Sequence, residues 1–165
     1  WRAVIMEKSK PNIAKELWYL DFHVNPDYRT IAVPEDIDTY TPTFINERIK
    51  AIIGATNKKT PITHEITSMG GDAYGMLGGV DVIKNAPVKI NTLGTGCVMS
   101  AAVPLLACGT GKRIITKNTF AMVHQVSSWD SGGKASDIMA DAIHTEALQE
   151  KYELLLTVVS ANKEE

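Results

Sequence analysis

The sequence has 165 residues, of which 44% are hydrophobic and 22% charged, and its formal net charge at pH 7 is −2. This length predicts one domain with a single core, and the near-neutral charge gives no electrostatic basis for binding nucleic acid or a membrane surface. No apolar run reaches the roughly 18 residues that a membrane-spanning helix requires. The two cysteines, Cys97 and Cys108, lie in apolar surroundings, which is typical of reduced core residues and indicates a cytoplasmic protein.

The first part of the chain predicts an arm, a strand and a helix. Residues 1–16 are polar and mixed, which predicts an N-terminal extension, whereas the apolar and aromatic residues 16–22 predict a strand. Thr41 and Pro42 suit the N-cap and the first position of a helix. We expect that helix to end at Gly54.

The next segment repeats this alternation of strand and helix. Residues 62–68 alternate in polarity, as in a half-buried strand, and lead into Gly70 and Gly71. Two adjacent glycines permit positive φ angles and close backbone approach, so we expect a turn there. An apolar face predicts a helix over residues 73–84, and a strand is expected over residues 88–93.

A nearly uncharged motif then runs from Gly94 to Gly109. We expect a glycine-rich turn that leads into a buried helix, with Ser100 at the start of the helix. Free N–H groups at a helix start favour negative charge, and a hydroxyl there can attack a carbonyl while nearby N–H groups hold the oxyanion. On this motif alone, the alternative is that Ser100 only caps an ordinary core helix.

The last part of the chain predicts a strand, a loop and a long helix. Residues 120–124 form a short apolar run that ends at His124, and a loop rich in serine and glycine follows. Residues 135–160 carry one apolar stripe and predict a helix of about 39 Å, at about 1.5 Å per residue. Such a helix projects beyond a domain of this size, so we expect it to make an oligomer contact. The alternative is a domain-crossing helix that contains a break.

The order of these elements predicts an α/β fold with a largely parallel sheet and right-handed crossovers. Because parallel strands end at the same edge of a sheet, we expect Gly71, Ser100 and His124 to come together. Backbone N–H groups, a hydroxyl and an imidazole are the parts that acyl transfer needs. Each also has a structural interpretation, because a glycine pair can simply turn the chain and a strand-end histidine can simply form hydrogen bonds.

Several sequence blocks resemble ClpP, the proteolytic subunit of the Clp proteases. The resemblance covers about residues 17–160 and implies repeated β-α-β units of the ClpP/crotonase type with a long C-terminal handle helix. It divides the chain into an arm at 1–16, a catalytic head at 17–134 and a handle helix at 135–165. The blocks are Ser68-Met69-Gly70-Gly71, Gly96-Cys97-Val98-Met99-Ser100-Ala101-Ala102, Gly111-Lys112-Arg113, Met122-Val123-His124-Gln125 and Ala135-Ser136-Asp137-Ile138.

The resemblance implies a serine endopeptidase with Ser100 as the nucleophile and His124 as the general base. The N–H groups of Gly71 and Ala101 would form its oxyanion hole. It implies no metal and no cofactor for this chain. ATP would be used by a partner, an AAA+ unfoldase of the ClpX or ClpA type. It also implies heptameric rings stacked as a tetradecamer, whose chamber admits peptides or unfolded polypeptides. No nucleic-acid or membrane partner is implied.

The sequence departs from the family pattern in several places. Met69 and Val126 stand where the family usually has proline, and the family's triad aspartate is expected beyond Glu165, so we assign no acid. The alternative function is therefore a catalytically inactive, ClpP-like structural or regulatory ring subunit. A crotonase-like acyl-CoA enzyme and a serine–lysine dyad fit the pattern of Ser100 and His124 less well.

Overall fold

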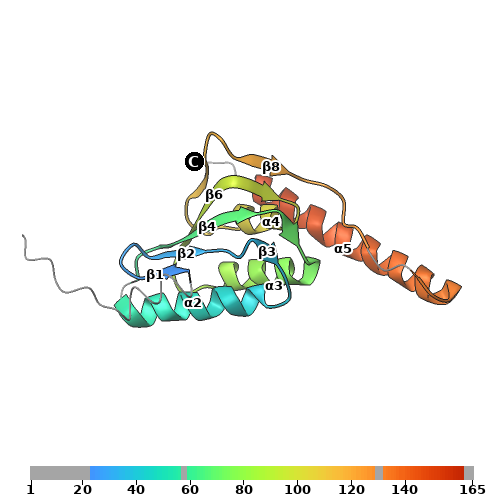
Figure 1. Ribbon diagram of the computed structural model, residues 1–165, viewed down its shortest axis with the longest axis horizontal. Coiled ribbons are helices and arrows are strands. Elements are labelled where there is room, and N and C mark those ends of the chain that lie inside the picture. Colours follow the sequence, from blue (N-terminus) through green and yellow to red (C-terminus); the bar gives the residue numbers. More distant parts are fainter. Residues whose placement is uncertain (1–22, 57–58, 129–131, 162–165) are drawn as a thin grey trace, which may run out of the picture.

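The computed structural model describes residues 23–56, 59–128 and 132–161. Figure 1 shows a twisted sheet with α2 and α3 packed along one side, and α5 extending away from it. The expected arm at 1–16 and the expected strand at 16–22 lie outside the described residues. The elements are β1 (Val24–Asn25), β2 (Thr30–Ala32), β3 (Asp36–Ile37), α2 (Thr41–Thr56), β4 (Ile62–Ser68), β5 (Gly70–Gly71), α3 (Ala73–Lys84), β6 (Ile90–Met99), α4 (Ala102–Ala107), β7 (Arg113–Ile115), β8 (Phe120–Met122) and α5 (Ala135–Ala161).

Parallel strands form most of the main sheet. Its order is β1-β2-β4-β6-β7, and β8 also pairs with β6, nearer to the C-terminal end of that strand. The pair β1–β2 is antiparallel, whereas β2–β4, β4–β6, β6–β7 and β6–β8 are parallel. Helices α2, α3 and α4 connect these parallel strands, as a parallel sheet requires. The predicted α/β fold with a mostly parallel sheet is therefore confirmed.

Side chains from β4, α2 and α3 form the core between the sheet and its helices. Strand β4 has the predicted bounds, and its buried positions alternate with more exposed ones. Helix α3 also has the predicted bounds and buries Met76, Val80 and Ile83. Burying a large apolar side chain contributes about 1.5–3 kcal/mol, so these faces hold the helices on the sheet.

Helix α2 begins at Thr41, but Asp38 supplies the cap that we expected from Thr41. The Asp38 carboxylate accepts hydrogen bonds from the N–H groups of Tyr40 and Thr41, at N···O distances of 2.9 and 3.0 Å. The Thr41 hydroxyl is turned inward and accepts a hydrogen bond from the Asp38 N–H. The helix continues past Gly54 to Thr56, and Gly54 does not adopt the positive φ angle expected of a C-terminal cap.

Strand β6 is longer than expected, and the helix after it is shorter. The strand continues to Met99, whereas the sequence indicated a turn and a helix over much of this motif. Residues 97–99 pair with residues 120–122 of β8, and Val98 also pairs with Ser68 of β4. These pairings between distant segments keep the glycine-rich stretch extended, so α4 begins only at Ala102.

The C-terminal helix α5 is continuous over 27 residues, so the alternative of a broken helix is wrong. Tyr152 is buried against the head, whereas Met139 and Ile143, nearer the N-terminus of the helix, are 65% and 63% exposed. The projecting helix is thus confirmed, and the oligomer contact expected of it stays a prediction. Within 23–56, 59–128 and 132–161, no helix combines the length and the apolar character needed to cross a membrane.

Candidate active site

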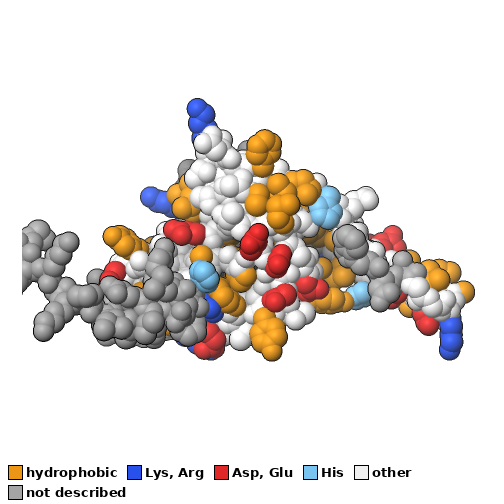
Figure 2. Space-filling model, in the orientation of Figure 1, with side chains coloured by type: hydrophobic (Ala, Val, Ile, Leu, Met, Phe, Trp, Pro, Cys, Tyr) orange, Lys and Arg blue, Asp and Glu red, His pale blue; other side chains and the backbone are white. Residues whose placement is uncertain are grey.

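A cleft of about 580 Å³ lies where β5, β6 and β8 end and α5 begins to cross the head. Gly71, Ser100, Ala101 and His124, the four residues predicted for the site, all line it. Figure 2 shows hydrophobic side chains gathered over β8, where Phe120 is exposed, close to a histidine. The parallel topology therefore brings these segments to one edge of the sheet, as their positions after strands predicted.

Ser100 occupies a tight turn between β6 and α4, in a backbone conformation that is rare for a residue other than glycine. Its φ angle is +52°. Its N–H donates to the Met122 carbonyl at 2.8 Å, and its own carbonyl accepts from the Val103 N–H at 3.0 Å and the Tyr152 hydroxyl at 3.3 Å. The backbone is thus held on both sides, while the side-chain hydroxyl has no hydrogen-bond partner among the described residues.

Gly70 and Gly71 form strand β5 rather than the expected free turn. They pair with β3, and both have positive φ angles, +107° and +142°. A Cβ on Gly70 would lie 2.6 Å from the Ser100 Cβ, and one on Gly71 would overlap the Ile37 carbonyl. Only glycine fits both positions, because β5 is wedged between β3 and the Ser100 turn.

The geometry of β5 also sets the direction of the Gly71 N–H. The following residue, Asp72, donates its N–H to the Ile37 carbonyl at 2.7 Å. Successive N–H groups of a strand point to opposite edges, so the Gly71 N–H points away from β3. The Ala101 nitrogen would be 3.1 Å from a Cβ on Gly70, which places the two segments in direct contact. Two backbone donors therefore border the same cleft.

His124 lies just beyond β8, which ends at Met122 rather than at the histidine. Its Nδ1 is 2.6 Å from the Gln125 carbonyl oxygen. Because a carbonyl oxygen can only accept, Nδ1 is the donor in this contact, and in the neutral imidazole Nε2 is then the nitrogen with the lone pair. A general base that takes a proton from a serine hydroxyl needs this tautomer. Among the described residues no hydrogen bond joins Ser100 to His124, and such contacts often form only when substrate binds.

Other residues of the cleft wall come from α3 and α5 and were not predicted. Met76, Leu148 and Tyr152 provide apolar surface, and burial raises the pKa of the Tyr152 hydroxyl. The Tyr74 hydroxyl and His144 Nε2 form a hydrogen bond across the two helices, with the rings stacked at 5.9 Å between centroids. The helical spacing of the residues in α3 and α5 indicates which of them share a face of their helix. It does not indicate that this face borders the cleft.

No group of three or more His, Cys, Asp or Glu side chains that could hold an ion occurs in the described parts of the chain. Both cysteines are free thiols, and burial raises the pKa of Cys108 to about 12. Besides the Ser100 hydroxyl and the His124 imidazole, the cleft is lined by the carboxylates of Asp72 and Asp141 and by His144.

The chain is thus an α/β protein with a mostly parallel sheet, a cleft at one edge of that sheet and a long C-terminal helix. The chain belongs to the Clp protease family, whose sequence profile matches residues 14–165.

Individual relatives agree with this assignment. The chain is 36% identical over 88 residues to ATP-dependent Clp protease proteolytic subunit 2 of Thermobifida fusca, covering 53% of this chain and 43% of the relative. It is 32% identical over 135 residues to the proteolytic subunit of Porphyromonas gingivalis, covering 81% and 59%. The chain thus spans about half the length of these relatives. A ClpP1 mutant from Listeria monocytogenes has the same fold, with a TM-score of 0.70 and 23% identity over 82% of this chain and 74% of that chain.

Proposed function

We propose that this protein is a serine-type endopeptidase subunit of the ClpP kind that cleaves peptides and unfolded polypeptides. One observation carries the proposal: the Ser100 hydroxyl, which has no hydrogen-bond partner among the described residues and sits on a strained backbone, shares a cleft with a histidine whose Nδ1 faces the Gln125 carbonyl. The chain belongs to the Clp protease family, and its relatives are named as proteolytic subunits, which supports a peptidase interpretation of this arrangement.

In the proposed reaction, the Ser100 hydroxyl oxygen attacks the scissile carbonyl carbon while Nε2 of His124 takes its proton. The carbonyl oxygen becomes negatively charged and accepts hydrogen bonds from the Gly71 and Ala101 N–H groups. His124 then protonates the leaving amine, and water hydrolyses the acyl-enzyme by the reverse sequence. A single preorganised oxyanion donor typically contributes about 10²–10³ to kcat.

The proposed substrate and assembly follow the same comparison. The apolar cleft wall made by Met76, Leu148 and Tyr152 suits an apolar substrate side chain next to the scissile bond. The exposed apolar residues of α5, such as Met139 and Ile143, suit contacts between subunits in stacked heptameric rings. An AAA+ unfoldase of the ClpX or ClpA type would use ATP and feed unfolded chains to the chamber, in the cytoplasm.

The second candidate is a catalytically inactive ring subunit, and one observation favours it. In the described residues no hydrogen bond joins Ser100 to His124, and the acceptor facing His124 Nδ1 is a backbone carbonyl where a catalytic triad has a carboxylate. Under this alternative the chain would assemble normally but would cleave nothing.

Cleavage of fluorogenic peptides with apolar residues tests the proposal. The full chain should hydrolyse them, and Ser100→Ala should abolish cleavage. The matched control replaces Ser127 and Ser128, which line the same cleft, by alanine and should leave cleavage intact. Rings of normal size without any cleavage would support the inactive alternative, and cleavage that survives Ser100→Ala would refute the role of Ser100.

A further inference from the structure

Helix α5 makes a direct contact with the loop that carries His124. The Val126 N–H donates to Oε1 of Gln149 at 2.8 Å, although the two residues are 23 positions apart. Strand β8 has already ended at Met122, so this N–H has no strand partner. A half-buried amide without an acceptor is unfavourable, and the Gln149 side chain provides that acceptor from the helix.

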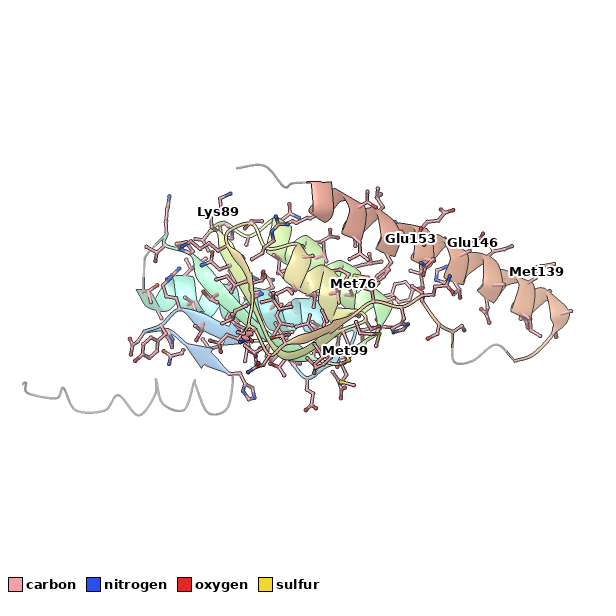
Figure 3. All side chains as sticks on the ribbon, turned by 90° about the horizontal axis from the view of Figure 1, so that it is seen from above. Met76, Lys89, Met99, Met139, Glu146 and Glu153 are labelled. Atoms are coloured by element: carbon pink, nitrogen blue, oxygen red, sulfur yellow. The ribbon has the colours of Figure 1, made fainter. Side chains whose placement is uncertain are left out.

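The orientation of the Gln149 amide is itself fixed. Its Nε2 donates to Oε1 of Glu153, one turn further along α5, at 2.6 Å. Because a carboxylate only accepts, Glu153 selects the rotamer in which Gln149 turns its NH₂ along the helix and its oxygen towards Val126. Figure 3 shows Glu153 on the part of α5 that lies beside the head, whereas Met139 is near the end that projects away from it.

The peptide group between Gln125 and Val126 links Gln149 to the histidine. Its N–H is the group that donates to Gln149, and its carbonyl is the group that accepts from Nδ1 of His124. A peptide unit is planar, and in the trans form its N–H and carbonyl point in opposite directions. Fixing the N–H from one side therefore fixes the carbonyl that holds the imidazole on the other side. Hydrogen bonds in such a chain also polarise one another.

The same face of α5 reaches the turn of the nucleophile. Tyr152, three residues after Gln149 and therefore its neighbour on the helix surface, donates its hydroxyl to the Ser100 carbonyl. One helix face thus contacts the backbone on both sides of the cleft. This second contact fixes the position of α5 relative to Ser100, from which Gln149 reaches the His124 loop.

We propose that Gln149 is a positioning residue of this site. Through the peptide group between Gln125 and Val126, it holds the His124 imidazole with its proton on Nδ1 and its lone pair on Nε2, ready to accept the proton of Ser100. The inference rests on the proposed peptidase function for its catalytic consequence. The tautomer itself does not depend on that function and is measured separately.

The first arm of the test uses variants of the full chain. Gln149→Met keeps the side-chain volume and removes the acceptor. It should lower the rate at which a fluorophosphonate labels Ser100, and kcat for peptide cleavage, by roughly tenfold with KM unchanged. The double change Q149E/E153Q exchanges the two groups, keeps the net charge and restores both hydrogen bonds. It should return both rates to within about twofold of the wild type. Glu146→Gln, on an exposed part of α5, is the control and should change nothing.

The second arm measures the tautomer of His124 by ¹H–¹⁵N NMR, which a merely structural role of Gln149 would leave unchanged. The wild type and the double variant should show the proton on Nδ1, and Gln149→Met should populate the Nε2–H form. Glu153→Met, at an exposed position, should shift the tautomer in the same direction to a smaller extent. This variant replaces Gln149→Met in the test if Gln149→Met does not fold.

The outcomes separate the two proposals. A wild-type tautomer and labelling rate in Gln149→Met, or a double variant that remains as slow as Gln149→Met, would overturn the positioning role. A different result would overturn the peptidase function and leave the positioning role intact. In that case the wild type shows the Nδ1–H tautomer and Gln149→Met loses it, but Ser100 never reacts in either protein.

Discussion

His64 makes the stability of the fold depend on pH, because it is fully buried in β4 with neither ring nitrogen hydrogen-bonded within the described part of the chain. Its neighbours in the sheet are Ile31 and Thr92, which provide no charge. Burial disfavours the charged imidazole and lowers the pKa of His64 from 6.5 to about 4. Below pH 6.5 the unfolded chain therefore binds a proton that the folded chain does not, so stability is lost as the pH falls towards 4.

The size of this effect follows from the two pKa values. A change in the pKa from 6.5 to about 4 corresponds to about 3 kcal/mol, of which about 2 kcal/mol should be lost between about pH 7.5 and about pH 5. Urea unfolding at a series of pH values measures this loss. The other histidines of the chain, His23, His124 and His144, are exposed.

The matched variant is His64→Leu, which has a similar volume and cannot be protonated. It should abolish most of the pH dependence between about pH 7.5 and about pH 5, and it should be as stable as the wild type or up to about 1 kcal/mol more stable at neutral pH. Equal slopes of stability against pH in the wild type and in this variant would refute the reasoning.

Two further predictions concern packing, one next to Ser100 and one in the core. Gly70→Ala places a Cβ 2.6 Å from the Ser100 Cβ at a φ angle of +107°, so it should destabilise the fold by about 1–3 kcal/mol and slow labelling of Ser100. The control is Gly54→Ala, which has open space around it in α2 and should be neutral or stabilise the fold by up to about 1 kcal/mol. Equal effects of the two changes on thermal unfolding and on labelling of Ser100 would contradict this account. Burial raises the pKa of Cys108 to about 12, so its thiol should resist a disulfide reagent at about pH 8 until urea unfolds the chain, and rapid reaction of both native thiols would argue against that burial.

The parts of the fold that were predictable from sequence are those that local patterns determine. Residues 62–68 alternate in polarity and the helix at 73–84 has one apolar face, so both elements have the expected bounds. His64, in the strand at 62–68, has a feature that the local pattern does not predict. His64 lies on the same buried face as Ile62 and Ile66, and nothing in the sequence pattern shows that a polar ring would be buried there without a partner.

The parts that were not predictable depend on pairing between distant segments. Gly70 and Gly71 resemble a turn until β3 is placed beside them, and the motif after residue 93 resembles a helix until β8 pairs with its end. Gln149 is an ordinary polar residue of a helix by its spacing. Its role depends on where the loop after β8 passes α5, and no local signal contains that information.

The central claim is that Ser100 is the nucleophile of this cleft, and the most direct test is to map covalent modification of the full chain. A fluorophosphonate should add once to the folded protein, and tandem mass spectrometry of the digested protein should locate it on Ser100. Its absence from Ser127 and Ser128, which line the same cleft, would show that reactivity is specific to the strained turn. An unmodified chain, or modification that persists in Ser100→Ala, would contradict the account.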